Sequence, residues 1–183
     1  MARTILSNKR FNLTLNRLSH QIVENYPSLD DVRFIGIQEK GVIMAERIAQ
    51  RLTQLYRKKV HIGKLDITFY RDDFRTREKP LKASSTDIDF EVEGKNIVLI
   101  DDVLYTGRSV HAGISAILDF GRPETIELMC MIDRRFNRHF PIKADYAGFT
   151  VDAVDEAYVR VEWENVEGED RVLLLSAKEV RNK

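Results

Sequence analysis

The sequence predicts an α/β fold, with a mostly parallel central sheet that carries helices on both faces. Two observations predict it. Short apolar runs of strand length alternate along the chain with longer segments whose apolar residues recur at helical spacing. The run Ile97–Ile100 consists of β-forming residues only, which is typical of a strand buried on both faces, and a helical segment follows soon after it.

The composition bounds the class of protein. A chain of 183 residues fits one domain, which we take to span 1–183. Its 29 Lys and Arg residues balance 29 Asp and Glu residues, so no overall charge attracts nucleic acid or membrane. The single cysteine, Cys130, lies in an apolar run and indicates a buried thiol in a reducing compartment. No apolar run could span a membrane and no signal-peptide core follows Met1–Arg3, so we expect a cytoplasmic protein without a membrane partner.

The N-terminal half predicts two helices and two strands in alternation. Phe11–Tyr26 has an apolar stripe at helical spacing. Val32–Ile37 is a strand that runs through a glycine-containing turn into a second helix, Val42–Tyr56. Val60–Tyr70 alternates apolar and polar residues as a strand does, and the charge-rich segment 71–87 then predicts a loop.

The C-terminal half adds further strands and two segments of opposite charge. Thr125–Ile132 and Arg171–Ser176 are apolar runs of strand length. Between them, 133–143 holds four Lys and Arg residues, whereas 152–170 carries eight acids and one base. The last residues, 179–183, predict a loose polar tail.

The residues after the strand Ile97–Ile100 carry the chemistry. Asp101 and Asp102 follow the apolar run, and Thr106–Ser109 then turns into a helix. Ligands of open α/β sheets bind beyond the carboxyl ends of the strands, and a glycine turn at a helix N-terminus presents free N–H groups to an anion. The segment therefore offers a phosphate cradle beside two carboxylates that can hold sugar hydroxyls or a metal. The structural alternative is a helix cap at a solvated corner.

The complete pattern, two acids after an apolar run and Thr-Gly-x-Ser after three further residues, resembles the phosphoribosyl-pyrophosphate (PRPP) motif of type I phosphoribosyltransferases. Within that class, Asp101–Arg108 looks like the PyrR family, pyrimidine-operon attenuation regulators that double as uracil phosphoribosyltransferases. The resemblance covers about residues 10–177. It implies a type I phosphoribosyltransferase fold with a small hood, from about 134–164 and the termini. It also implies conversion of uracil and PRPP to UMP and pyrophosphate.

The resemblance implies a role for each residue of this motif. Asp101 and Asp102 would hold the ribose hydroxyls and, through the ribose and water, a Mg²⁺ ion. Together with Arg71 they are the expected catalytic residues. The whole motif would bind PRPP and its 5′-phosphate: Asp101, Asp102, Val103, Leu104, Tyr105, Thr106, Gly107, Arg108 and Ser109. Purine-salvage relatives usually place an acid where Tyr105 stands, which argues against a hypoxanthine or guanine enzyme.

A second turn at a helix start matches the family's pyrophosphate loop. It comprises Gln38, Glu39, Lys40 and Gly41. The regulators usually have Gly-Ile-Lys-Thr-Arg-Gly there, and this chain has Gly-Ile-Gln-Glu-Lys-Gly. Lys40 keeps a cation but lacks the bidentate fork of arginine, and Glu39 places an acid beside the site of an anion.

The resemblance assigns two further parts of the site. The loop 71–87 corresponds to the lid that closes over PRPP in phosphoribosyltransferases and keeps water from the oxocarbenium-like centre. Base binding is expected from Arg134 and Val159, which fall in the region of the hood.

Messenger-RNA binding is a separate expectation from the same family. Arg17 and His20 fall on the helix positions that contribute an Arg and a His to RNA binding in the regulators. Arg138 and Lys143 lie in the basic segment, which could face RNA. The alternative for both pairs is an ordinary solvated surface, and the acids of 152–170 would repel RNA phosphates.

The expected partners are therefore PRPP, uracil or UMP, and leader mRNA, in a homodimer or a larger homo-oligomer. Two other functions remain open from the sequence. One is a nucleotide-sensing RNA-binding attenuator with little or no catalysis. The other is a phosphoribosyltransferase for another base, either xanthine/guanine or orotate.

Overall fold

The structure is a computed structural model that describes residues 2–72, 85–152, 157–176 and 179. Its centre is a five-stranded, all-parallel sheet with the strand order β3-β2-β4-β5-β6. The strands are β2 (Val32–Ile37), β3 (His61–Leu65), β4 (Asn96–Leu104), β5 (Thr125–Arg134) and β6 (Tyr146–Val151). This sheet confirms the α/β class predicted from the sequence.

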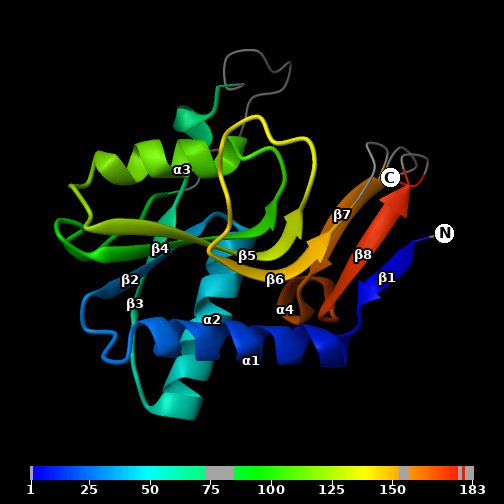
Figure 1. Ribbon diagram of the computed structural model, residues 1–183, viewed down its shortest axis with the longest axis horizontal. Coiled ribbons are helices and arrows are strands. Elements are labelled where there is room, and N and C mark those ends of the chain that lie inside the picture. Colours follow the sequence, from blue (N-terminus) through cyan, green and yellow to red (C-terminus); the bar gives the residue numbers. More distant parts are fainter. Residues whose placement is uncertain (1, 73–84, 153–156, 177–178, 180–183) are drawn as a thin grey trace.

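Helices cover both faces of the sheet. In Figure 1, α3 (Arg108–Leu118) lies above the sheet and α1 (Asn8–Asn25) below it, and α2 (Lys40–Tyr56) packs on the same side as α1. Alternate residues of β4 face the two sides: Val98 and Ile100 pack in the core under α1 and α2, whereas Ile97 and Leu99 pack in the core under α3. The double coverage explains why this strand is apolar without alternation.

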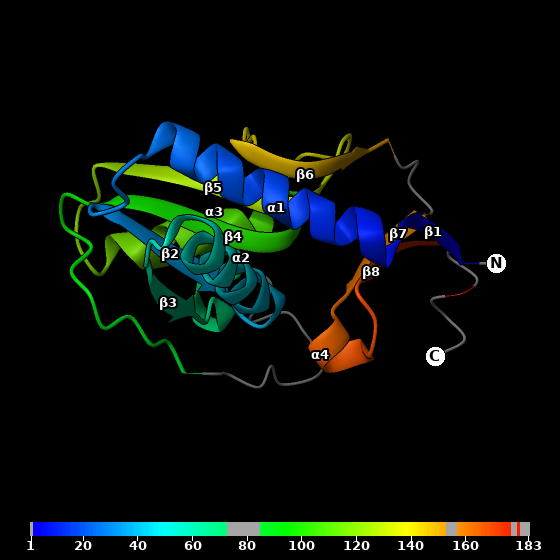
Figure 2. The same ribbon diagram turned by 90° about the horizontal axis from the view of Figure 1, so that it is seen from below.

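A smaller antiparallel sheet stands at one end of the molecule, with the strand order β1-β8-β7 (Figures 1 and 2). It consists of β1 (Arg3–Leu6), β7 (Ala157–Glu162) and β8 (Arg171–Ser176), and the short helix α4 (Glu164–Glu167) joins β7 to β8. The segment Tyr146–Val151, which the sequence placed in the hood region, instead pairs with β5 in the central sheet. The second sheet thus brings an N-terminal strand beside residues 157–176.

Most predicted elements are confirmed, and β2 and β8 have the predicted bounds. The predicted strand Val60–Tyr70 is wrong in its second half, because β3 ends at Leu65 and Thr68–Tyr70 forms a 3-10 helix. Asp66 is the physical reason. Its Oδ1 accepts hydrogen bonds from the backbone N–H of Thr68, at 2.8 Å, and from the Thr68 hydroxyl, at 2.5 Å, which turns the chain.

Smaller differences concern element ends. Helices α1 and α2 begin at Asn8 and Lys40, earlier than their apolar stripes suggest. Strand β4 continues through both acids to Leu104, because its pairing with β5 extends to Leu104 opposite Asp133. Cys130 is buried, as predicted, and burial raises the pKa of its thiol. No helix in the described part of the chain is long and apolar enough to cross a membrane.

A buried ion pair ties the second sheet to the helices. Asp170, which is 0% exposed, precedes β8 and accepts from Arg47 of α2 at 2.6 and 3.1 Å. It also accepts from Asn12 of α1 at 3.2 Å and from the backbone N–H of Glu164 at 2.9 Å. Burial alone would raise the pKa of Asp170, but these hydrogen bonds and the Arg47 charge lower it below its ordinary value.

We therefore predict that Asp170→Asn lowers the free energy of unfolding by about 3 kcal/mol at neutral pH, because it leaves the Arg47 charge unpaired. The folded pKa of Asp170 is depressed. The loss should therefore be complete above the ordinary pKa of aspartate and should disappear as the pH falls through the folded value. Urea denaturation between pH 3 and 8 measures it.

Asp152→Asn is the matched control, since it removes an acid whose ion pair with Arg135 is more than half exposed, at 54% and 58%. It should change stability little. Equal effects of the two variants would contradict a stabilising role for the buried pair.

Candidate functional site

The candidate site surrounds the carboxyl end of β4. Asp101 continues the row of β4 side chains that face α3, and Asp102 continues the row that faces α1 and α2. Each acid lines a different hollow. Asp101 and the turn Tyr105–Ser109 line a hollow of about 220 Å³. Asp102 lines a second hollow, of about 300 Å³, together with Lys40 and residues of β7. The two acids therefore straddle the end of the strand.

Both aspartates are partly buried, and they interact. The backbone N–H of Asp102 donates to Oδ1 of Asp101 at 2.9 Å. Burial raises the pKa of Asp101 well above its ordinary value, the Asp102 charge adds to the rise, and Arg71 opposes it. Burial also raises the pKa of Asp102, against the nearby charge of Lys40. A pair of acids held in this way stores unfavourable free energy that a bound cation or hydroxyl groups would relieve.

We predict that Asp101→Asn stabilises the folded protein at neutral pH by about 1 kcal/mol, because it removes a desolvated charge. The folded pKa of Asp101 is raised. The penalty is thus absent below the ordinary pKa of aspartate, grows as the pH rises, and is complete above the folded value. Between pH 4 and pH 9, the free energy of unfolding of Asp101→Asn should exceed that of wild type by an amount that grows with pH. A variant less stable than wild type at pH 8 would contradict the prediction.

The turn after β4 has the geometry of an anion cradle. Gly107 precedes α3 with φ +86° and ψ 0°, a conformation that favours glycine, and the first turn of α3 therefore begins at the hollow; the Arg108 N–H donates to the Thr106 hydroxyl at 3.4 Å. The turn is held from outside, because the carbonyl of Thr106 accepts from the His139 N–H at 2.9 Å and the carbonyl of Tyr105 accepts from Arg138. Arg71 lines the same hollow.

Arg108, the one cation of the turn Tyr105–Ser109, contacts side chains outside the turn. Arg108 pairs with Asp72, and its Nε lies 3.2 Å from Nδ1 of His139. Tyr70, two residues before Asp72, donates to Asp119 of the segment after α3 at 2.5 Å. One end of the predicted lid, 71–87, is thereby attached to the α3 side of the site. Residues 73–84 of that loop lie outside the described residues.

The predicted pyrophosphate loop lies at the start of α2, close to β4. At Gly41 a Cβ would come within 2.3 Å of the Ile100 carbonyl oxygen, so this approach requires glycine. The side chain of Lys40 points toward the second sheet, where it donates to the carbonyl of Val161 and lies 3.0 Å from Oε1 of Glu167. Glu39 is exposed, and Gln38 donates to the carbonyl of Ser85 at 2.5 Å.

A third hollow, of about 270 Å³, adjoins the other two. It is lined by Val103, Tyr105, Arg134, Tyr158 and Val159. The guanidinium carbon of Arg134 lies 4.0 Å from the centre of the Tyr105 ring. Arg134 is only 4% exposed, and its Nε and Nη2 have no hydrogen-bond partner in the described part of the structure. Buried donors of this kind suit a ligand that supplies acceptor oxygens.

The sequence placed Tyr158 and Arg160 in the expected hood, 134–164, but assigned neither of them a role in the site. Tyr158 lines both the second and the third hollow, and Arg160 lines the second together with Lys40 and Asp102. Both lie on β7, on either side of the expected residue Val159. The signal was weak, because only the packing of the second sheet against β4 brings these side chains to the site.

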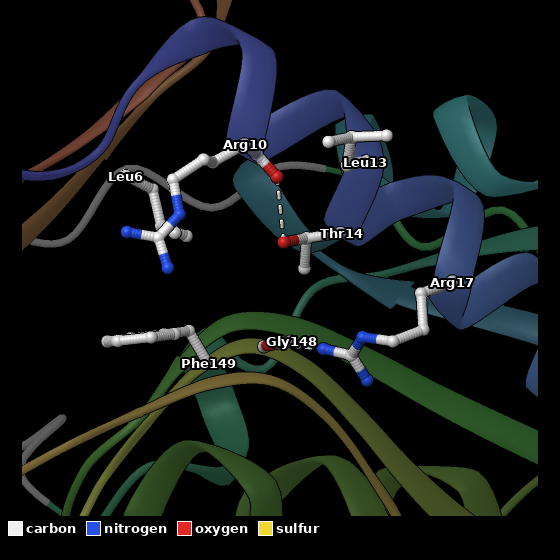
Figure 3. A pocket seen from close by; sticks show the side chains of 7 residues that line it. All are labelled: Leu6, Arg10, Leu13, Thr14, Arg17, Gly148 and Phe149. Carbon is white, nitrogen blue, oxygen red and sulfur yellow. Dashed lines mark hydrogen bonds between the residues drawn. The ribbon is translucent and has the colours of Figure 1, made fainter.

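Of the four candidate RNA-binding residues, only Arg17 is among the described residues that line the hollow between α1 and β6. Arg17 lines this surface hollow, of about 330 Å³, together with Arg10 and Phe149 (Figure 3), and it donates to the carbonyls of Gly148 and Ala147. His20 contacts Tyr56 of α2.

The other two candidates lie elsewhere. Arg138 is directed inward, toward Asp133 and the carbonyl of Tyr105, whereas Lys143 is exposed. None of His20, Arg138 and Lys143 is among the described residues that line the Arg17 hollow.

Comparisons with known proteins agree with this geometry. A family model described as the phosphoribosyl transferase domain matches residues 1–165, which makes the chain a phosphoribosyltransferase by class. The chain is 41% identical over 175 residues to the bifunctional protein PyrR of Pelotomaculum thermopropionicum, covering 96% of each protein. It is 40% identical over 165 residues to the bifunctional protein PyrR of Enterococcus faecalis V583, covering 90% of this chain and 92% of that protein. The chain belongs to the PyrR family, which confirms the resemblance of Asp101–Arg108.

Solved structures show the same fold at low identity. A hypoxanthine-guanine phosphoribosyltransferase of Bacillus anthracis superposes with a TM-score of 0.71 at 16% identity, covering 95% of this chain and 97% of that one. A hypoxanthine phosphoribosyltransferase of Trypanosoma cruzi superposes with a TM-score of 0.75 at 13% identity, covering 98% and 93%. At such identities the likeness establishes the type I phosphoribosyltransferase fold and leaves the choice of base to the site.

Proposed function

We propose that the chain transfers the phosphoribosyl group of PRPP to uracil, giving UMP and pyrophosphate. The observation that carries this proposal is the meeting of three hollows at one strand end, where an anion cradle, a carboxylate pair and a pocket with two unpaired Arg134 donors adjoin. A nucleotide needs the same three environments, for its phosphate, its sugar and its base. The names of the PyrR relatives support the same function.

In this proposal each part of the chain has a simple task. The N–H groups after Gly107 hold the 5′-phosphate, while Asp101 and Asp102 hold the ribose hydroxyls. Lys40 and Arg71 line the two hollows flanking the acids, and in this proposal they contact the leaving pyrophosphate. Catalysis is then mostly positioning and charge stabilisation around a loose displacement at the anomeric carbon.

A Mg²⁺ ion would neutralise the diphosphate as it leaves. The carboxylate pair is suited to hold it only indirectly, because the described residues contain no cluster of three or more His, Cys, Asp or Glu side chains that could bind a metal. Its remaining ligands would come from the ribose hydroxyls, the diphosphate and water.

We also propose that Arg134 and Val159 contact the base, with 71–87 as a lid and the second sheet as the hood. A cytoplasmic location and a homodimer or larger homo-oligomer belong to the same proposal. The single buried thiol, Cys130, suits a reducing compartment.

The test of catalysis is consumption of PRPP with Mg²⁺ and each of uracil, orotate, guanine, xanthine and hypoxanthine. Uracil should be the preferred base. The double variant Asp101→Asn/Asp102→Asn should lower kcat/KM for PRPP by at least about 100-fold, because both groups that hold the ribose become neutral.

Asp89→Asn/Glu91→Gln removes the same charge from two exposed acids and serves as the control. Turnover of a purine base without turnover of uracil would refute the assignment. Unchanged PRPP kinetics in the double aspartate variant would show that the acid pair is a structural corner.

RNA binding is the second part of the proposal, and the relatives' name, bifunctional protein PyrR, supports it. Its candidates are Arg17, His20, Arg138 and Lys143. Of these residues, the structure places only Arg17 in the hollow between α1 and β6, and a symmetric oligomer could assemble two copies of a basic face into a wider groove. Arg17 and Arg138 would also have to serve RNA beside their present contacts within the chain.

Titration of pyrimidine-leader RNA, with and without UMP, tests this part. We expect UMP to strengthen binding. Arg17→Ala/His20→Ala should weaken it and should lower the salt slope by about one unit for each phosphate that the protein no longer neutralises. Lys95→Ala, which removes a cation paired with Asp31, is the control. If no leader RNA binds at low salt in either condition, the protein is an enzyme only.

A further inference from the structure

Tyr105 lines both the hollow beside Asp101 and the third hollow, and Arg134 lines the third hollow. They come from different strands: Tyr105 directly follows β4, and Arg134 is the last residue of β5. The guanidinium carbon lies over the ring at 4.0 Å from its centre. At this separation the guanidinium packs on the ring face, a contact that arginine makes well because its head group is planar.

This contact restricts the directions in which the N–H donors of Arg134 can point. All N–H groups of a guanidinium lie in its plane, so a ring packed on that plane restricts their directions. The Nε and Nη2 atoms have no partner among the described residues, although the side chain is only 4% exposed. Leaving such donors without acceptors is unfavourable. A base with an acceptor oxygen at this position therefore binds more favourably than a base without one.

We propose that Tyr105 is a specificity-determining positioning residue: it holds the Arg134 fork toward a carbonyl oxygen of the base. This inference rests on the proposed uracil transfer and adds to it the group that the site recognises. Tyr105 acts through Arg134, so its ring matters and its hydroxyl does not.

Thio-substituted bases test the inference, because sulfur is a much weaker acceptor than oxygen. We expect wild type to use either 2-thiouracil or 4-thiouracil at least about tenfold less efficiently than uracil, measured as kcat/KM at saturating PRPP. Tyr105→Leu should bring that ratio close to one, mainly by raising KM for uracil. Tyr105→Phe should keep the preference for uracil at the wild-type level. Arg134→Lys should lose this preference, because lysine lacks the fork.

Tyr158→Leu is the matched control, since it removes another aromatic ring from the same hollow. It should leave the ratio of uracil to thiouracil in place. Equal use of all three bases by wild type would overturn the inference. A ratio that survives in Tyr105→Leu, or that collapses equally in Tyr158→Leu, would also overturn it.

These outcomes separate the inference from the proposed function. If wild type transfers to uracil and only the Tyr105 variants behave otherwise than expected, the inference alone fails. If wild type shows no transfer to uracil while PRPP is consumed with another base, the proposed function fails and the inference falls with it.

Discussion

Successive residues of a strand point to opposite faces of the sheet, and the site depends on this constraint. Asp101 and Asp102 line different hollows, so the site lies around the end of β4 and each acid has its own wall. The turn Tyr105–Ser109 provides the wall beside Asp101, and β7 provides the wall beside Asp102. A central sheet alone would leave Asp102 in solvent, where its pKa would not be raised.

The sequence predicted four strands of the central sheet, β2, β3, β4 and β5, because double coverage by helices leaves a simple apolar signal in such strands, but it missed the edge strand β6. It failed where a local hydrogen bond competed with the pattern, as Asp66 does when it turns the chain after Leu65. Ile67 and Phe69 alternate with polar residues as in a strand, yet Ile67 is 6% exposed and Phe69 is 70% exposed on a 3-10 turn. Alternation alone therefore could not fix the end of β3.

The sequence predicted the parts of the candidate site that are contiguous in the chain, namely the acid pair and the turn that follows it. Contacts between distant segments could not be predicted. The packing of Arg134 on Tyr105 depends on the pairing of β4 with β5, and the position of Tyr158 depends on how the second sheet docks. Neither arrangement leaves a periodic pattern in the sequence, so the resemblance could supply Arg134 and Tyr105 separately but not the contact between them.

Helix α2 connects the site to the second sheet through two ion pairs. Lys40 and Arg47 are seven residues apart, which places them on one face of the helix, and they pair with Glu167 and Asp170 at 3.0 and 2.6 Å. Lys40 is also the departure from the usual arginine of the pyrophosphate loop. A cation that pyrophosphate would need is thus already bound to an acid of the second sheet. If the proposed pyrophosphate loop binds an anion through Lys40, that anion competes with Glu167 for the same ammonium group.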